Sequence, residues 1–193
     1  MNTLRKWVMM KNSKGFTLTE ALIVISIISI LSAVAIPNII DWLPNYRLKG
    51  AARDVYSTMQ KARMLAVKTN RDTAVILDTA NKKYALCDNW DTSVSPSKCI
   101  QTLPLQYVDF SKMKSGVGYG HGAATKQATG ALFTLSPDDD VSYQNNVVVF
   151  NSRGVGNSGY IYLDHQKNTT TYSVSSQSSG VIQILKWQGS GWE

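Results

Sequence analysis

Cysteine and histidine are scarce in this sequence, with two of each among 193 residues. No second cysteine pair and no histidine pair lies near the cysteines, so the motif of a tetrahedral metal site is missing. No set of nucleophile, base and orienting residue has a spacing that suggests catalysis. The sequence therefore predicts no metal, no cofactor and no catalytic residue.

Acidic residues are absent before Glu20, and charged residues of either sign are absent from Ala21 to Ile40. The stretch from Phe16 to Ile40 is mostly apolar, and about 20 residues suffice for a helix to cross a bilayer. The alternative, a buried core helix, needs a larger domain around it than about 150 remaining residues provide. A membrane span is the preferred interpretation.

The leader before this span carries positive charge only, from Arg5, Lys6, Lys11 and Lys14. By the positive-inside rule the leader stays in the cytoplasm and the rest of the chain crosses to the periplasm. A secretory signal peptide is cut after its apolar region, whereas Gly15 stands before it. The apolar segment is therefore expected to remain in the mature protein.

Glu20 is the one ionisable residue of the apolar segment. A carboxylate within the bilayer costs on the order of 2 to 3 kcal/mol, so such residues usually serve a function. In one interpretation Glu20 lies near the interface and reaches water. In the other, cleavage after Gly15 creates an amine on Phe16, and Glu20 pairs with that amine in a neighbouring copy.

The run from Lys14 to Glu20, Lys-Gly-Phe-Thr-Leu-Thr-Glu, resembles the processing signal of type IV prepilins and type II secretion pseudopilins. This resemblance implies that prepilin peptidase cuts between Gly15 and Phe16 and methylates the new N-terminus. It also implies that Glu20 contacts a neighbouring subunit's N-terminus. Pro37 lies where pilins usually carry a helix-loosening proline. A leader of fifteen residues is long for a major pilin and favours a minor component.

From Asp41 to Thr69 the chain has an amphipathic helical pattern. Apolar residues recur at spacings of three and four, as expected for one buried helix face: Leu48, Ala52, Val55, Met59, Ala62 and Ala66. The charged residues between them indicate a solvated face. Pro37 and Pro44 predict a kink or a locally loosened stretch.

After Asn70 the pattern changes to short runs rich in β-branched and aromatic residues, separated by turn residues. The predicted strands are Thr73–Leu77, Lys83–Leu86, Leu105–Phe110, Ala131–Leu135, Val147–Phe150, Tyr160–Leu163, Thr171–Val174 and Val181–Trp187. An antiparallel β body packed on the amphipathic helix gives a pilin-like α+β fold. The expected organisation is a leader at 1–15, a transmembrane and assembly helix at 16–40, and one globular domain at 41–193, with its helix at 41–69 and its β body at 70–193.

Two further segments resemble the GspH/FimT family of minor pilins and pseudopilins: residues 51–70, an Ala- and Arg-rich helix, and Val148 to Gly154. The resemblance implies a minor pilin that joins or primes a pilus, at its tip. Its partners would be prepilin peptidase, major and minor pilins or pseudopilins, an inner-membrane assembly platform, and lipid before assembly. The subunit would begin in the bacterial inner membrane and end in a fibre.

Cys87 and Cys99 enclose a short polar loop. Two cysteines in an oxidising compartment are most simply read as one disulfide. Closing such a loop stabilises by about 3 kcal/mol in the chain-entropy model. A structural role is expected.

A pseudopilin of a type II secretion machine shares all of these features and is the first alternative function. The second is DNA uptake, because some FimT-like proteins bind DNA through basic C-terminal residues. Here the tail from Leu185 to Glu193 has one cation, Lys186, whereas phosphate binding needs several. Trp187 and Trp192 are candidates for stacking on single strands.

Two other segments suggest weaker alternatives. Asp138, Asp139 and Asp140 carry oxygen ligands that suit calcium but lack the spacing of a defined calcium loop. The glycine-rich segment from Gly116 to Gly122 lacks the ending of a phosphate-binding loop. We expect it to form a surface loop.

Overall fold

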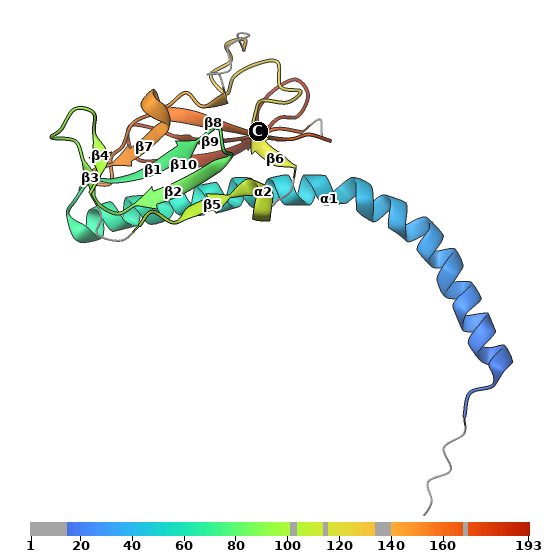
Figure 1. The fold of residues 1–193 in the computed structure, drawn as a ribbon. Coiled ribbons are helices and arrows are strands. Elements are labelled where there is room, and N and C mark those ends of the chain that lie inside the picture. Colours follow the sequence, from blue (N-terminus) through green and yellow to red (C-terminus); the bar gives the residue numbers. More distant parts are fainter. Residues whose placement is uncertain (1–14, 101–103, 114–115, 134–139, 168–169) are drawn as a thin grey trace, which may run out of the picture. The chain divides into compact units, whose positions relative to one another are not determined.

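The computed structural model describes residues 15–100, 104–113, 116–133, 140–167 and 170–193. The chain divides into two compact units, Met1–Ile40 and Asp41–Glu193. Helix α1 (Leu18–Thr69) contributes to both (Figure 1). Its first part is the apolar segment, and its second part lies along the β-sheets of the body.

Helix α1 continues through Pro37 and Pro44, so the expected loosening does not interrupt it. A proline removes one backbone hydrogen bond, and the flanking turns keep the helical conformation. The side-chain amide of Asn38 donates to the Val34 carbonyl at 3.2 Å in the same region. Each proline therefore sits inside the helix without ending it.

The helix ends where the sequence predicts. Asn70 takes a positive φ of 51°, and the Arg71 N–H donates to the Ala66 carbonyl at 3.3 Å, which is the geometry of a Schellman cap. The chain then turns back, and the Thr73 hydroxyl donates to the Ala62 carbonyl at 2.9 Å. This buried bond fixes the first strand against the helix that precedes it.

The body contains two four-stranded sheets, and every strand pair is antiparallel. The first sheet has the order β5 (Tyr107–Asp109), β2 (Lys83–Cys87), β1 (Thr73–Asp78), β7 (Val147–Phe150). The second has the order β10 (Ile182–Lys186), β9 (Tyr172–Ser176), β8 (Gly159–His165), β6 (Val117–Tyr119). Shorter elements are β3 (Trp90–Asp91), β4 (Lys98–Cys99), α2 (Phe110–Met113) and the 3-10 turn η2 (Gln144–Asn146).

The core forms between the second part of α1 and both sheets. The six apolar residues predicted for the helix face are all fully buried, as is Ala51. The first sheet contributes Val75, Val148 and Phe150 to this core, and the second contributes Ile161, Leu163 and Val174. The α+β fold with one long helix on antiparallel sheets is confirmed.

Most predicted strands occur within one or two residues of their expected bounds, with two exceptions. Phe110 begins helix α2 instead of ending a strand, and its buried ring packs between Tyr84 and Tyr119. Residues 131–133 form no strand, and Leu132 makes only an isolated bridge to Lys126. The rest of that prediction, at 134–135, lies outside the described residues.

The expectation of a surface loop at Gly116 to Gly122 was wrong for its first part, although residues 120–122 do form a connection outside the strands. Val117–Tyr119 is strand β6, which pairs with β8, and Val117 is buried. A Cβ on Gly116, which has a φ of +88°, would collide with the His165 ring, and one on Gly120 would lie 2.7 Å from the Asp164 carboxylate. These glycines permit close packing, which composition alone did not distinguish from mobility.

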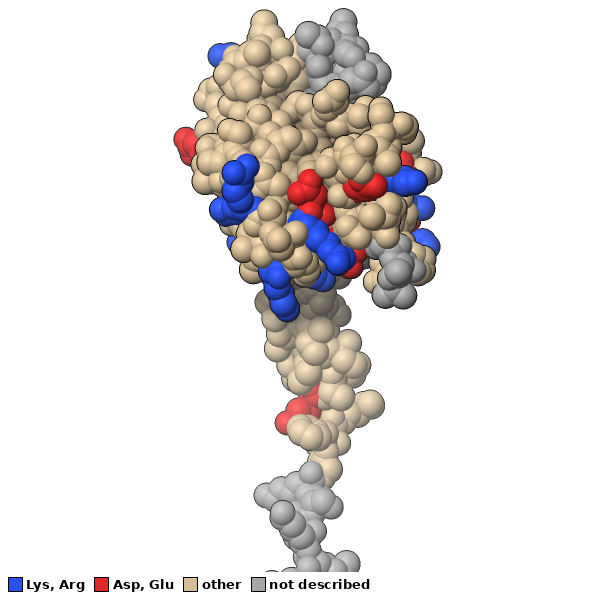
Figure 2. All heavy atoms as spheres, turned by 90° about the vertical axis from the view of Figure 1, so that its left-hand side faces the viewer, with Lys and Arg blue, Asp and Glu red and all other residues tan. Residues whose placement is uncertain are grey.

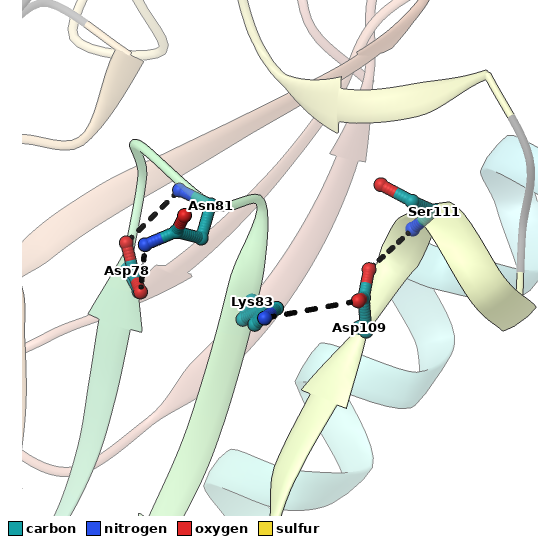
Figure 3. Close-up of polar contacts among 5 residues, drawn as sticks. All are labelled: Asp78, Asn81, Lys83, Asp109 and Ser111. Carbon is teal, nitrogen blue, oxygen red and sulfur yellow. Dashed lines mark hydrogen bonds and ion pairs between the residues drawn. The ribbon is translucent and has the colours of Figure 1, made fainter.

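Polar contacts fix the hairpin of β1 and β2 and its edge strand β5 (Figure 3). Asn81 donates from its backbone and side-chain amides to Asp78 at 3.0 and 2.8 Å, and these bonds hold the pKa of Asp78 below its ordinary value. Across the sheet, Lys83 Nζ lies 3.9 Å from Asp109, which also accepts the Ser111 N–H at 2.9 Å. The edge strand β5 is thus tied to β2 and to the helix α2 that follows it.

Two methionines of α1 test the packing of the helix. Met59 is fully buried and Met64 is 64% exposed. We expect Met59→Ala to lower the free energy of unfolding by about 2 to 5 kcal/mol, because it leaves a cavity under both sheets. Met64→Ala should change it by about 0.5 kcal/mol or less. Denaturant unfolding of both variants measures this, and equal effects would contradict the assigned helix face.

Candidate functional site

The apolar segment of α1 is uncovered around its whole circumference. Its large side chains are between 49% and 79% exposed: Leu18, Leu22, Ile23, Val24, Ile25, Ile27, Ile28, Ile30, Leu31, Val34, Ile36, Ile39 and Ile40. By length and composition α1 is the one helix among the described residues that is suited to cross a membrane. An evenly apolar cylinder is stable only in lipid or among other apolar helices.

Two serine hydroxyls inside this segment are bonded within the helix. Ser26 donates to the Leu22 carbonyl and Ser29 to the Ile25 carbonyl, both at 2.8 Å. Serine side chains in helices commonly bond back to the preceding turn in this way. Both hydroxyls can therefore enter an environment without water at little cost.

Thr17 caps the start of the helix, and the sequence analysis did not anticipate this. The Glu20 N–H donates to Thr17 Oγ1 at 3.2 Å, one residue before the helix begins at Leu18. Thr-x-x-Glu before an apolar run is the sequence pattern of a capping box, so the signal was present. Glu20 is exposed, and its carboxylate forms no hydrogen bond or ion pair with the part of the chain described.

Gly15 and Phe16 lie outside the helix, directly before this cap. The Phe16 side chain is 87% exposed, and a Cβ on Gly15 would meet no atom within 4 Å. The fold itself therefore does not require glycine at this position. Pro37 lies within the helix, three residues before the first unit ends.

An exposed aromatic pair follows the apolar segment immediately in the chain. Trp42 and Tyr46 are 59% and 58% exposed, and their ring centroids lie 5.0 Å apart. Tryptophan and tyrosine are enriched where membrane meets water, because their rings are apolar and their tips are polar. Their place directly after Ile40 fits a membrane boundary, a signal the sequence analysis did not use.

Cys87 and Cys99 form a disulfide that joins β2 to β4, with the Cα atoms 6.0 Å apart. The β3–β4 hairpin that it anchors covers the face of the first sheet turned away from α1. A second small core lies there, containing Ala74, Cys87 and Val147, with Trp90 packed against it. The disulfide therefore has a structural position.

A cluster of titratable groups lies beside β6 and β8. His121 Nδ1 is 2.7 Å from Asp140 Oδ1. Burial, and the nearby Asp140 charge, raise the pKa of Asp164 above its usual value. No group of three potential metal ligands occurs in the described ranges. The calcium interpretation also involves Asp138 and Asp139, which lie outside those ranges.

The C-terminal aromatics pack internally, which weakens the DNA-stacking alternative. Trp187 is 4% exposed and packs edge-to-face on Trp192 with centroids 5.4 Å apart. Trp192 packs on Tyr162 and donates its indole N–H to the Lys126 carbonyl at 2.7 Å. Rings held in this way are not free to stack on bases.

Residues 10–36 match the prokaryotic N-terminal methylation motif, and residues 51–180 match the family described as type II transport protein GspH. A fimbrial protein of Pseudomonas aeruginosa is 29% identical over 138 residues, covering 68% of this chain and 83% of that protein.

Two solved structures are similar at low identity. The minor pseudopilin EpsH from the type 2 secretion system of Vibrio cholerae is 12% identical with a TM-score of 0.46, covering 72% of this chain and 96% of that one. The type IV minor pilin FimU of Pseudomonas aeruginosa is 15% identical with a TM-score of 0.46, covering 76% and 97%.

The methylation motif, the bare apolar helix and the α+β body together define a type IV pilin-like protein. The GspH match covers more than half of the chain and includes most of the buried helix face and every strand of the two four-stranded sheets except β10. Within the pilin-like class, the chain belongs to the type II transport protein GspH family.

Removal of the disulfide should loosen the β3–β4 hairpin. The double change Cys87→Ser and Cys99→Ser is expected to lower the free energy of unfolding by about 3 kcal/mol, because the unfolded chain regains the entropy of the loop. Thermal unfolding with and without a reductant measures this. The reductant should destabilise the unmodified protein to the same extent and leave the variant unchanged; an unmodified protein insensitive to reduction would contradict the structural role.

Proposed function

We propose that this protein is a minor type IV pilin that joins or primes a pilus, at its tip. It begins as a single-pass protein of the bacterial inner membrane, with its N-terminus in the cytoplasm and its body in the periplasm. The observation that carries the proposal is the apolar helix, which is exposed on all sides in the isolated chain. In a fibre, burial against equivalent helices replaces contact with lipid.

Prepilin peptidase is the proposed first partner. It cuts between Gly15 and Phe16, and it methylates the new amine of Phe16. Two observations support this position: the bond lies outside the helix, and the fold leaves room for a side chain at Gly15. The requirement for glycine is therefore assigned to the peptidase.

Glu20 is the proposed contact between subunits. Its carboxylate pairs with the methylated amine of Phe16 in a neighbouring subunit, which offsets the cost of a charge at this depth. The Thr17 cap holds Glu20 in the first helical turn, close to where that amine would lie. Further partners are other pilins and the inner-membrane assembly platform.

A pseudopilin of a type II secretion machine is the second candidate function. The description of the matching family, type II transport protein GspH, favours it. Both candidates use the same processing and the same helix, so they differ only in the machine that the subunit enters.

The substitution Glu20→Gln tests whether the Glu20 carboxylate is needed for contact between subunits. Glu193→Gln is the matched control, at the only other glutamate of the chain. Glu20→Gln should insert and be processed normally but enter sheared fibres at least about tenfold less. The reason is that a neighbour's amine left unpaired in the bilayer costs on the order of 2 to 3 kcal/mol. Normal incorporation of Glu20→Gln into fibres would contradict the proposed pairing.

A clean deletion of the gene distinguishes the two machines. Surface pili in sheared fractions and enzymes released into the medium are scored in parallel. Loss of pili with intact secretion is the expected result. Loss of secretion with intact pili would overturn the pilus assignment and make the protein a type II pseudopilin.

A further inference from the structure

One flank of α1 within the body carries an open groove. Tyr56, Gln60, Met64 and Lys68 follow at intervals of four residues, so they form one stripe along the helix. All four side chains are at least partly exposed. This stripe borders two hollows that lie one after the other along the helix.

The first hollow lies between Tyr56 and residues 182–185 of β10 and has a volume of about 440 Å³. The second, of about 350 Å³, is lined by Gln60, Arg63, Met64, Val67, Lys68, Arg153 and Gly154. We call the two hollows together the flank groove.

Arg63 lines the second hollow. Its Nε donates to the Gly154 carbonyl at 3.0 Å, which joins the helix to the turn after β7. A Cβ on Gly180, just before β10, would lie 3.0 Å from Arg63 Nε and would collide with the Gly154 carbonyl. The helix, the turn after β7 and the residue before β10 therefore come together at Arg63.

The backbone of β10 faces the flank groove with an open edge. The Trp187 N–H points toward β9 and donates to Thr171, whereas the Lys186 N–H points the other way and donates to Glu193. Because backbone groups alternate along a strand, those of Ile184 and Ile182 also point away from β9. No described residue pairs with them on that side. Such an edge accepts an extended peptide.

The second hollow of the flank groove combines basic side chains with exposed apolar ones. Met64 and Val67 are 64% and 54% exposed. Lys68 and Arg153 are exposed beside them, and neither forms an ion pair with any residue in the described ranges. In Figure 2, Lys and Arg side chains gather over the lower part of the body, with acidic side chains among them. This end suits a segment with both carboxylates and apolar side chains.

We propose that the flank groove binds an extended acidic segment of a neighbouring pilin-like subunit. The segment adds to the free edge of β10 through its backbone and places its carboxylates against Lys68 and Arg153. The inference rests on the proposed assembly function. A peptide is favoured over nucleic acid because the first hollow offers backbone donors and acceptors along β10, and no cation among the described residues lines it.

The test places a photo-crosslinking amino acid at Met64 in the full-length protein in its own cells. The expected product is an adduct with another subunit that carries a prepilin motif, and its crosslinked peptide is acidic. The double change Lys68→Glu and Arg153→Glu should lower the adduct yield about tenfold by placing like charges together. The double change Lys98→Glu and Lys112→Glu, at two exposed lysines elsewhere, is the matched control and should leave the yield unchanged.

The open edge is tested by Ile184→Pro, with Ile184→Val as its control. Proline removes an N–H that points away from β9, so the ladder within the sheet is retained. Ile184→Pro should also lower the yield about tenfold, and Ile184→Val should not. If Ile184→Pro fails to fold, the double change Lys68→Glu and Arg153→Glu alone tests the proposed binding.

Several outcomes would overturn the inference: no adduct, an adduct with nucleic acid or lipid, or a yield that survives the reversal at Lys68 and Arg153. The unmodified protein is followed in sheared fibres at the same time. Its presence there with a failed crosslink would refute only the flank groove. Its absence from fibres would refute the proposed function and, with it, the inference that rests on it.

Discussion

The apolar surface of α1 between Leu18 and Ile40 must be removed from water, and no described part of the chain covers it. Burying one large aliphatic side chain is worth about 1.5 to 3 kcal/mol, and more than ten such side chains are exposed here. A buried Glu20 costs on the order of 2 to 3 kcal/mol, so it opposes this drive only weakly. Lipid and neighbouring helices are thus the two environments in which the subunit is stable, and assembly is a transfer between them.

In the body, the second part of the same helix is buried by the protein itself, because both sheets pack closely on it. Four fully buried alanines, Ala51, Ala52, Ala62 and Ala66, let both sheets approach the helix backbone closely. The disulfide hairpin then covers the outer face of the first sheet. The sheets cover one face of α1 and the hairpin covers the first sheet, but the flank of α1 near β10 stays open. This flank is available for contact with a neighbouring subunit.

Sequence reasoning succeeded where the signal was local. The spacing of Leu48, Val55 and Met59 predicted a helix face because neighbouring turns alone determine which side chains share a side. It failed at Gly116 to Gly122, where the decisive neighbours His165 and Asp164 lie far along the chain. It also left Trp187 and Trp192 as possible base-stacking groups, whereas long-range packing on Tyr162 commits Trp192 to the fold.

The sequence by itself determined the class of this protein, because the charged leader, the Gly15-Phe16 junction, Glu20 and the apolar run act through local chemistry and length. Only the tertiary structure joined Arg63 to Gly154, which lie 91 residues apart, and oriented the free edge of β10 toward α1. A periodic pattern specifies which face of an element is buried. It does not specify the partner of that face, since the partner depends on the register and packing of the whole body.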